Sequence, residues 1–297
     1  TRVRSSAASD VYKRQVRVHG SRNLAAVLEC GGVMIALRGG LEMAYDDVGV
    51  GTPVVFLHGF PLSRALWAPQ LGALLDHWRC IAPDLRGFGD SAAQAPYSVD
   101  QYADDVADLL DSLGLSRAVI AGLSLGGYIA FAFWRRHRAR VRALILADTR
   151  AAPDTEKARR TRRELIALAR DQGSRAVADA QMPFMVGAST RAKNPGIVDT
   201  VYRMLASAPV PGIIGALEAM MARPDSTPTL ATIDVPTLVI VGSEDVVVPV
   251  DEAESMSDRI AGSQLQVIEG AGHVSNLERP AAFNHVTSEF LAQLTSA

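Results

Sequence analysis

The chain has 297 residues, of which 48% are hydrophobic and 21% are charged, and its formal net charge at pH 7 is −2. These proportions are ordinary for a globular domain, and the length allows a full hydrophobic core. The small net charge argues against nucleic acid or an anionic membrane as a partner, and no apolar run approaches the roughly 18 residues that span a bilayer. The two cysteines, Cys30 and Cys80, are too few for a disulfide framework. We therefore expect a cytoplasmic globular protein.

Residues 1–33 are expected to be a leader that does not belong to the natural fold. Residues 5–15 resemble the in-frame translation of a sequencing adapter, and residues 16–33 show no clean hydrophobic period. Met34 is therefore the expected natural start, and the leader is left out of the fold prediction.

Apolar runs and helical patterns alternate along most of the remaining chain. Two short strands are expected within residues 34–48, and single strands at 53–57, 79–82, 118–121, 143–147, 237–241 and 264–268. Helices are expected at 66–75, 99–113 and from 125 to about 138, with a further helical pattern near the end of the chain. In the helix at 99–113, Asp104, Asp105 and Asp108 are expected to face outward. Strands that alternate with helices indicate a mostly parallel sheet covered on both faces.

The alternation stops between residues 149 and 232, which are helical in pattern and rich in Ala, Met and Arg. This divides the chain into a core, residues 34–148 and 233–297, and an inserted helical segment. The basic side chains of residues 156–175 are interpreted as a solvated helix face, with a basic substrate funnel as the alternative. Methionines between Met182 and Met221 are interpreted as core residues, with an adaptable apolar pocket as the alternative.

The strongest local signal is the run Gly122-Leu123-Ser124-Leu125-Gly126, between an apolar strand and a helical pattern. A serine in a G-x-S-x-G run at this place is typical of a nucleophile elbow, a sharp strand-to-helix turn that exposes the hydroxyl group. A turn this tight leaves no room for a Cβ atom at either glycine. We predict Ser124 as the nucleophile.

Candidate acids follow two of the later strands. The strand at 237–241 leads to Glu244 and Asp245, and Pro249 then opens the next helix. We predict Asp245 as the acid that orients a catalytic imidazole. Glu244 and Asp148, which closes an earlier strand, are the alternatives.

The candidate base is His273, in the glycine-rich loop that follows the strand at 264–268. A glycine-rich loop at the end of a strand can hold an imidazole over the sheet edge, where it removes the proton of the serine. Of the six histidines, only His273 and His285 follow Asp245 in the chain. His285 lies in the last helical pattern and is expected on its surface.

Together these residues resemble the α/β-hydrolase superfamily, and in particular the small capped hydrolases similar to 3-oxoadipate enol-lactonases and related carboxylesterases. The order Ser, Asp, His along the chain is the order of that superfamily. The run His58-Gly59-Phe60-Pro61 and the D-L-R-G-F-G-D-S loop at residues 84–91 match two further loops of the group. Leu125 departs from many lactonases and perhydrolases, which have Met at that position.

The resemblance implies an α/β-hydrolase fold with an eight-stranded, mostly parallel sheet and a helical cap between strands 6 and 7. It implies that the backbone N–H groups of Phe60 and Leu125 form the oxyanion hole. For His58 and the loop at 84–91 it implies a structural role.

The implied activity is that of a serine hydrolase that cleaves small to medium carboxylic esters or lactones through an acyl-enzyme, with no cofactor and no metal. A perhydrolase (cofactor-free haloperoxidase) and a carbon–carbon bond hydrolase remain alternatives, and a non-catalytic ligand-binding protein is a third. The sequence does not indicate the natural substrate or the oligomeric state.

Overall fold

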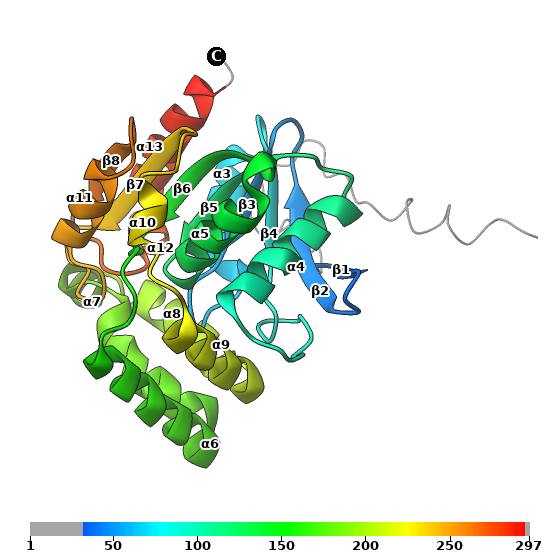
Figure 1. Ribbon diagram of the computed structural model, residues 1–297. Helices are drawn as coiled ribbons and strands as arrows, with labels where there is room; N and C mark the ends of the chain where they lie inside the picture. The colour runs from blue at the N-terminus through cyan, green and yellow to red at the C-terminus, as the bar shows by residue number, and fades with distance from the viewer. Residues whose placement is uncertain (1–31, 295–297) are drawn as a thin grey trace, which may run out of the picture.

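The computed structural model describes residues 32–294, and its centre is one eight-stranded sheet (Figure 1). The strands are β1 (Val33–Ala36), β2 (Glu42–Val48), β3 (Pro53–Leu57), β4 (Arg79–Pro83), β5 (Ala118–Leu123), β6 (Val141–Ala147), β7 (Thr237–Gly242) and β8 (Gln264–Ile268). Across the sheet their order is β1-β2-β4-β3-β5-β6-β7-β8. β2 pairs antiparallel with β1 and β4, and all other neighbours are parallel. The predicted fold class is confirmed, whereas the resemblance of residues 5–15 to an adapter lies outside the described residues.

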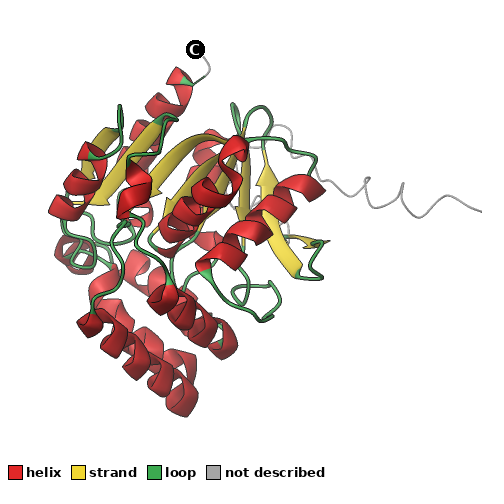
Figure 2. Cartoon of the chain, viewed as in Figure 1, coloured by secondary structure: helices red, strands yellow, loops and turns green. Residues whose placement is uncertain are grey.

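Helices cover both faces of this sheet (Figure 2). Those of the core are η2 (Arg64–Trp67), α3 (Ala68–Leu74), α4 (Val99–Ser112), α5 (Leu125–His137), η3 (Arg138–Arg140), α11 (Val250–Asp258), α12 (Ser275–Glu278) and α13 (Pro280–Gln293). The helix expected at 66–75 is thus a 3₁₀ turn followed by α3. The side chain of Ser98 caps α4 by accepting a hydrogen bond from the N–H of Gln101 at 2.9 Å.

The central strands are apolar because both of their faces are buried. Every residue of β5 is buried, and alternate residues of β3 enter different cores. Val55 and Leu57 pack in one hydrophobic cluster, and Val54 and Phe56 pack in the other. The sheet therefore separates two cores and holds its carboxyl edge, where the loops carry the candidate site, in a fixed place.

The expectation that Asp105 faces outward is wrong. Its carboxylate is buried and accepts two hydrogen bonds from Arg86, at 2.8 Å from Nε and 2.6 Å from the terminal nitrogen. The helical period alone predicts that this side chain faces solvent. The charge can be buried because both carboxylate oxygens are paired with the guanidinium group. Arg86 belongs to the D-L-R-G-F-G-D-S loop, so this pair fixes that loop against α4.

The inserted segment contains the helices α6 (Glu156–Met185), α7 (Ala188–Lys193), α8 (Pro195–Ser207), α9 (Val210–Ala222) and α10 (Thr227–Leu230), which follow β6 and precede β7. In Figure 1, α6, α8 and α9 lie below the sheet as a separate layer. α6 is kinked at Gly173, where φ is 77°. Among the described residues, no single helix is long and apolar enough to cross a membrane, although α8 and α9, bent by 93°, pass that test as a pair.

Candidate active site

Ser124 occupies the sharp turn between β5 and α5, with φ of 53° and ψ of −110°. Its backbone N–H donates to the carbonyl of Ala147 at 3.0 Å, which fixes the turn to the neighbouring strand. A Cβ atom at Gly122 would overlap the carbonyl oxygen of Gly126, and one at Gly126 would overlap that of Leu57. The steric reason that the sequence analysis gave for both glycines is therefore present in the structure.

Ser124, His273 and Asp245 lie in one hydrogen-bonded chain. The Nε2 atom of His273 is 2.9 Å from the hydroxyl oxygen of Ser124, and its Nδ1 atom is 2.8 Å from Oδ2 of Asp245. The other carboxylate oxygen, Oδ1, accepts the backbone N–H groups of Val247 at 2.7 Å and Val248 at 3.0 Å. Since Oδ2 can only accept, Nδ1 carries the imidazole proton and Nε2 is free to take the proton of the serine.

The electrostatic setting of His273 suits a base. Burial lowers the pKa of the imidazole, but the charge and hydrogen bond of Asp245, together with the charge of Asp148, outweigh burial and leave the pKa above its usual value of 6.5. Arg150 opposes this rise weakly. A raised pKa makes the neutral ring a stronger base, as removal of a serine proton requires.

The alternative acids have other partners. Glu244 turns away from the imidazole and accepts the backbone N–H of Ser189 at 2.8 Å and the hydroxyl group of the same residue. Asp148 accepts the N–H of Gly242 at 2.9 Å and binds the hydroxyl group of Ser275 at 2.6 Å. Neither is hydrogen-bonded to His273, so the geometry favours Asp245 over both. His285 is exposed and lies 3.4 Å from Glu289 on α13, as expected for a surface histidine.

Asp148 is a buried acid immediately behind the candidate triad. Its backbone has a φ of 46°, which is uncommon for a residue with a side chain. Burial and the neighbouring charge of Asp245 raise the pKa of Asp148 to about 8. The carboxyl group joins the end of β6 to β7 and to the turn after His273, and these partners are ones that the sequence did not indicate.

The residues assigned to the oxyanion hole belong to two segments that come close to Ser124. Leu125 is the first residue of α5, where N–H groups have no partner in the helix and the helix dipole favours a negative charge. Phe60 follows Gly59, at which an added Cβ would lie 3.4 Å from the Cβ of Ser124. The loop of Phe60 therefore comes close to the nucleophile, as an oxyanion hole requires.

His58 shapes this loop from behind. Its Nε2 atom accepts the backbone N–H of Leu85 at 3.0 Å, and its Nδ1 atom donates to the carbonyl of Gly59 at 2.9 Å. Burial lowers the pKa of His58, which keeps the ring neutral in this arrangement.

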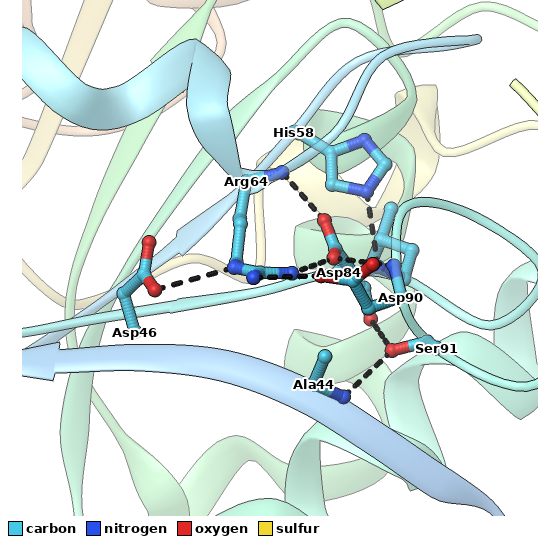
Figure 3. A network of polar contacts seen from close by, with 8 residues as sticks. Ala44, Asp46, His58, Arg64, Asp84, Asp90 and Ser91 are labelled. Carbon is cyan, nitrogen blue, oxygen red and sulfur yellow. Dashed lines mark hydrogen bonds and ion pairs between the residues drawn. The ribbon is translucent and has the colours of Figure 1, made fainter. Parts of the chain in front are cut away.

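Arg64 lies at the centre of an adjacent ion-pair network (Figure 3). Its guanidinium group pairs with Asp84, with Asp46 at 3.2 Å and with Asp90 at 2.9 Å. Asp84 also accepts the backbone N–H groups of Arg64 at 2.7 Å and of Asp90 at 2.9 Å. The network ties η2, which follows the Phe60 loop, to β2 and to the loop at 84–91. Sequence reasoning gave that loop a structural role but missed Arg64, because no motif links it to Asp84.

The described residues contain no group of three or more His, Cys, Asp or Glu side chains placed to hold a metal ion.

The basic side chains of α6 include Arg162, which pairs with Asp154, and Arg163, which pairs with Glu156. Met185 and Met220 are buried, whereas Met182, Met204 and Met221 are partly buried beside the cores.

Comparisons with known proteins agree with the fold. A family model described as the alpha/beta hydrolase fold matches residues 52–280. The structure of a thermophilic esterase from Thermogutta terrifontis is similar, with a TM-score of 0.86 and 40% identity over 89% of this chain and 98% of that chain. The enol-lactonase from Burkholderia xenovorans LB400 has a TM-score of 0.82 and 30% identity, over 88% of this chain and 100% of that chain.

In sequence, 3-oxoadipate enol-lactonase 1 of Acinetobacter baylyi is 29% identical over 271 residues, which cover 88% of this chain and 97% of that protein. Other similar proteins are named as a 2-hydroxymuconate semialdehyde hydrolase and a non-heme chloroperoxidase. The similar proteins thus share a fold and differ in the reactions that their names describe.

Proposed function

The chain belongs to the α/β-hydrolase family, and on this premise we propose that it is a serine hydrolase that cleaves carboxylic esters or lactones of small to medium size. The observation that carries the proposal is the hydrogen-bonded chain from Ser124 through His273 to Asp245, with distances of 2.9 and 2.8 Å. A nucleophile, a base and an orienting acid in this order activate a serine for acyl transfer.

In the first half-reaction, Ser124 attacks the carbonyl carbon while His273 takes its proton. Asp245 holds the imidazole in the required tautomer and stabilises the imidazolium ion that forms. The oxyanion accepts hydrogen bonds from the N–H groups of Phe60 and Leu125, each of which contributes on the order of 3 kcal/mol to the stabilisation of the transition state. His273 then protonates the leaving alkoxide.

In the second half-reaction, the same groups release the acyl group. His273 removes a proton from water, the hydroxide attacks the acyl-enzyme, and the proton returns to Ser124 as the carboxylic acid departs. For a lactone the leaving alkoxide stays covalently attached to the acyl group, so the product is one hydroxy acid.

The inserted helices α6–α10 are proposed to act as a cap that limits substrate size. The cap contacts the catalytic loops directly, because Gly187 lies against Gly272, the residue before His273. A roof at this place forms a bounded pocket of the kind that suits small ligands, in contrast to the open cleft that an emulsion of triglyceride requires.

The test is a series of p-nitrophenyl esters of rising chain length, assayed beside simple γ- and δ-lactones and the enol-lactone of 3-oxoadipate. We expect kcat/KM to peak at short or medium acyl chains, and Ser124→Ala to remove turnover and labelling by a fluorophosphonate. A peak beyond about C10 would contradict the bounded pocket. Peracid formation faster than ester hydrolysis would favour a perhydrolase, and an unlabelled Ser124 with no turnover would favour a binding protein.

A further inference from the structure

Glu278 is a buried carboxylate outside the candidate triad, and each of its oxygens accepts one backbone N–H. Oε1 accepts the N–H of Gly272 at 2.8 Å, and Oε2 accepts the N–H of Gly187 at 2.8 Å. Gly272 directly precedes His273, whereas Gly187 lies between α6 and α7 in the inserted helices. One side chain, 3% exposed, therefore holds the backbone of the histidine loop and the backbone of the cap.

The two backbones that Glu278 joins are also in direct contact. A Cβ atom at Gly272 would overlap the backbone nitrogen of Gly187, and a Cβ at Gly187 would come within 3.0 Å of the backbone nitrogen of Gly272. Both positions thus need the small residue for close approach, and neither segment can shift alone without disturbing the other.

Two residues of the cap that follow Gly187 are also bonded to the core. Ser189 binds Glu244, the residue before Asp245, through its N–H and its hydroxyl group. Thr190 is buried and accepts a hydrogen bond from Arg279 at 3.4 Å. Residues 186–190, here called the anchor segment, are therefore bonded to the loops of both Asp245 and His273.

We propose that Glu278 is a positioning residue that sets the place of His273 and couples it to the position of the cap. The inference rests on the proposed hydrolase function, since it assigns His273 the role of base. Any movement of the anchor segment pulls on the carboxylate that holds Gly272, and so changes the distances from His273 to Ser124 and Asp245. A substrate that enters by moving the cap must therefore displace helices other than this anchor, or lose alignment of the base.

Glu278→Gln separates the positioning role from simple cap attachment. An amide has one acceptor oxygen, so one of the two N–H groups loses its acceptor and faces an NH₂ group instead. We expect kcat to fall by about 10²-fold on p-nitrophenyl acetate, because a small displacement of a catalytic group costs about that factor. The acid limb of kcat/KM should also move to lower pH, since a His273 that leaves Asp245 loses the charge that raises its pKa.

Glu244→Gln is the matched control, because it makes the same chemical change but keeps both bonds to Ser189: the amide oxygen accepts the N–H, and the NH₂ group donates to the hydroxyl oxygen. The anchor segment therefore stays in place, and kcat on the acetate should stay close to that of the unchanged protein. Equal loss of kcat in both variants, or an unchanged kcat and pH profile in Glu278→Gln, would overturn the proposal. A merely structural Glu278 would lower the melting temperature and leave the pH profile in place.

If Glu278→Gln does not fold, Gly187→Ala tests the same coupling with the carboxylate intact. Gly187 has a φ of −65°, so alanine fits its backbone, but the added Cβ would overlap Oε2 of Glu244 and crowd the backbone nitrogen of Gly272, and so displaces the anchor segment from both. It should reproduce the loss of kcat and the shift of the acid limb, and an unchanged profile would overturn the proposal. Absence of ester turnover and of fluorophosphonate labelling in the unchanged protein would instead refute the proposed function.

Discussion

Replacing Asp245 with asparagine is the sharpest test of the acid, because the structure fixes how the new amide must lie. Oδ1 of Asp245 accepts two backbone N–H groups, from Val247 and Val248, while Oδ2 faces Nδ1 of His273. An asparagine keeps both backbone bonds only if its oxygen stays on that side. Its NH₂ group then points at Nδ1, which becomes an acceptor, and the imidazole proton moves to Nε2. In that tautomer His273 cannot take the proton of Ser124.

The flipped amide restores the productive tautomer but leaves two N–H groups without an acceptor, one buried (Val248) and one partly buried (Val247). Each costs about 1–2 kcal/mol, so the productive orientation lies about 2–4 kcal/mol higher, and kcat falls by roughly 30-fold to 10³-fold from this effect alone. Loss of the charge that stabilises the imidazolium ion adds to this, toward the roughly 10⁴-fold loss seen for the same change in a serine protease. Steady-state hydrolysis of p-nitrophenyl acetate measures it, with Glu244→Gln as the control. A loss below about tenfold would refute the assignment and place the acid at Asp148.

Three further outcomes follow from the same contacts. The acid limb of kcat/KM should have its midpoint above pH 6.5, because the folded state raises the pKa of His273 and only the neutral ring is a base; a midpoint below 6.5 would contradict this. Asp148→Asn should flatten the fall in unfolding free energy between pH 5 and pH 8. The pKa of Asp148 is 3.8 in the unfolded chain and about 8 in the folded protein, so between these pH values the folded protein binds more protons. The unfolding free energy therefore falls as the pH rises through this range, and urea midpoints at pH 5 and pH 8 test the direction of the change. Gly126→Ala should lower the unfolding free energy by about 1–3 kcal/mol, whereas Gly39→Ala, with open space around it, should not; equal effects would refute the steric reading of the turn.

The elements of the sheet could be predicted because each carries a local signal. β5 is an unbroken apolar run, and α4 combines a helical period with a capping serine, so both were placed within two residues of their bounds. The candidates Ser124, Asp245 and His273 rest on the same kind of signal, since each follows a predicted strand and parallel strands deliver their carboxyl ends to one edge. Asp105 was misplaced because its partner, Arg86, lies 19 residues away and no period reveals a buried ion pair.

Four carboxylates near the imidazole show what remains beyond sequence reasoning. Asp148, Glu244, Asp245 and Glu278 all lie at the carboxyl edge of the sheet or just after it, and their residue types alone would allow any of them to be the acid. Only the donors around each one distinguish them: an imidazole for Asp245, a serine hydroxyl group for Asp148, and backbone N–H groups of the inserted helices for Glu244 and Glu278. These donors come from residues up to 127 positions away in the chain, so the sequence alone does not indicate the partners of Asp148, Glu244 and Glu278. In the proposed mechanism, Asp245 orients His273, whereas Asp148, Glu244 and Glu278 hold the surrounding backbone, so substitutions can test the chemistry of His273 and its placement separately.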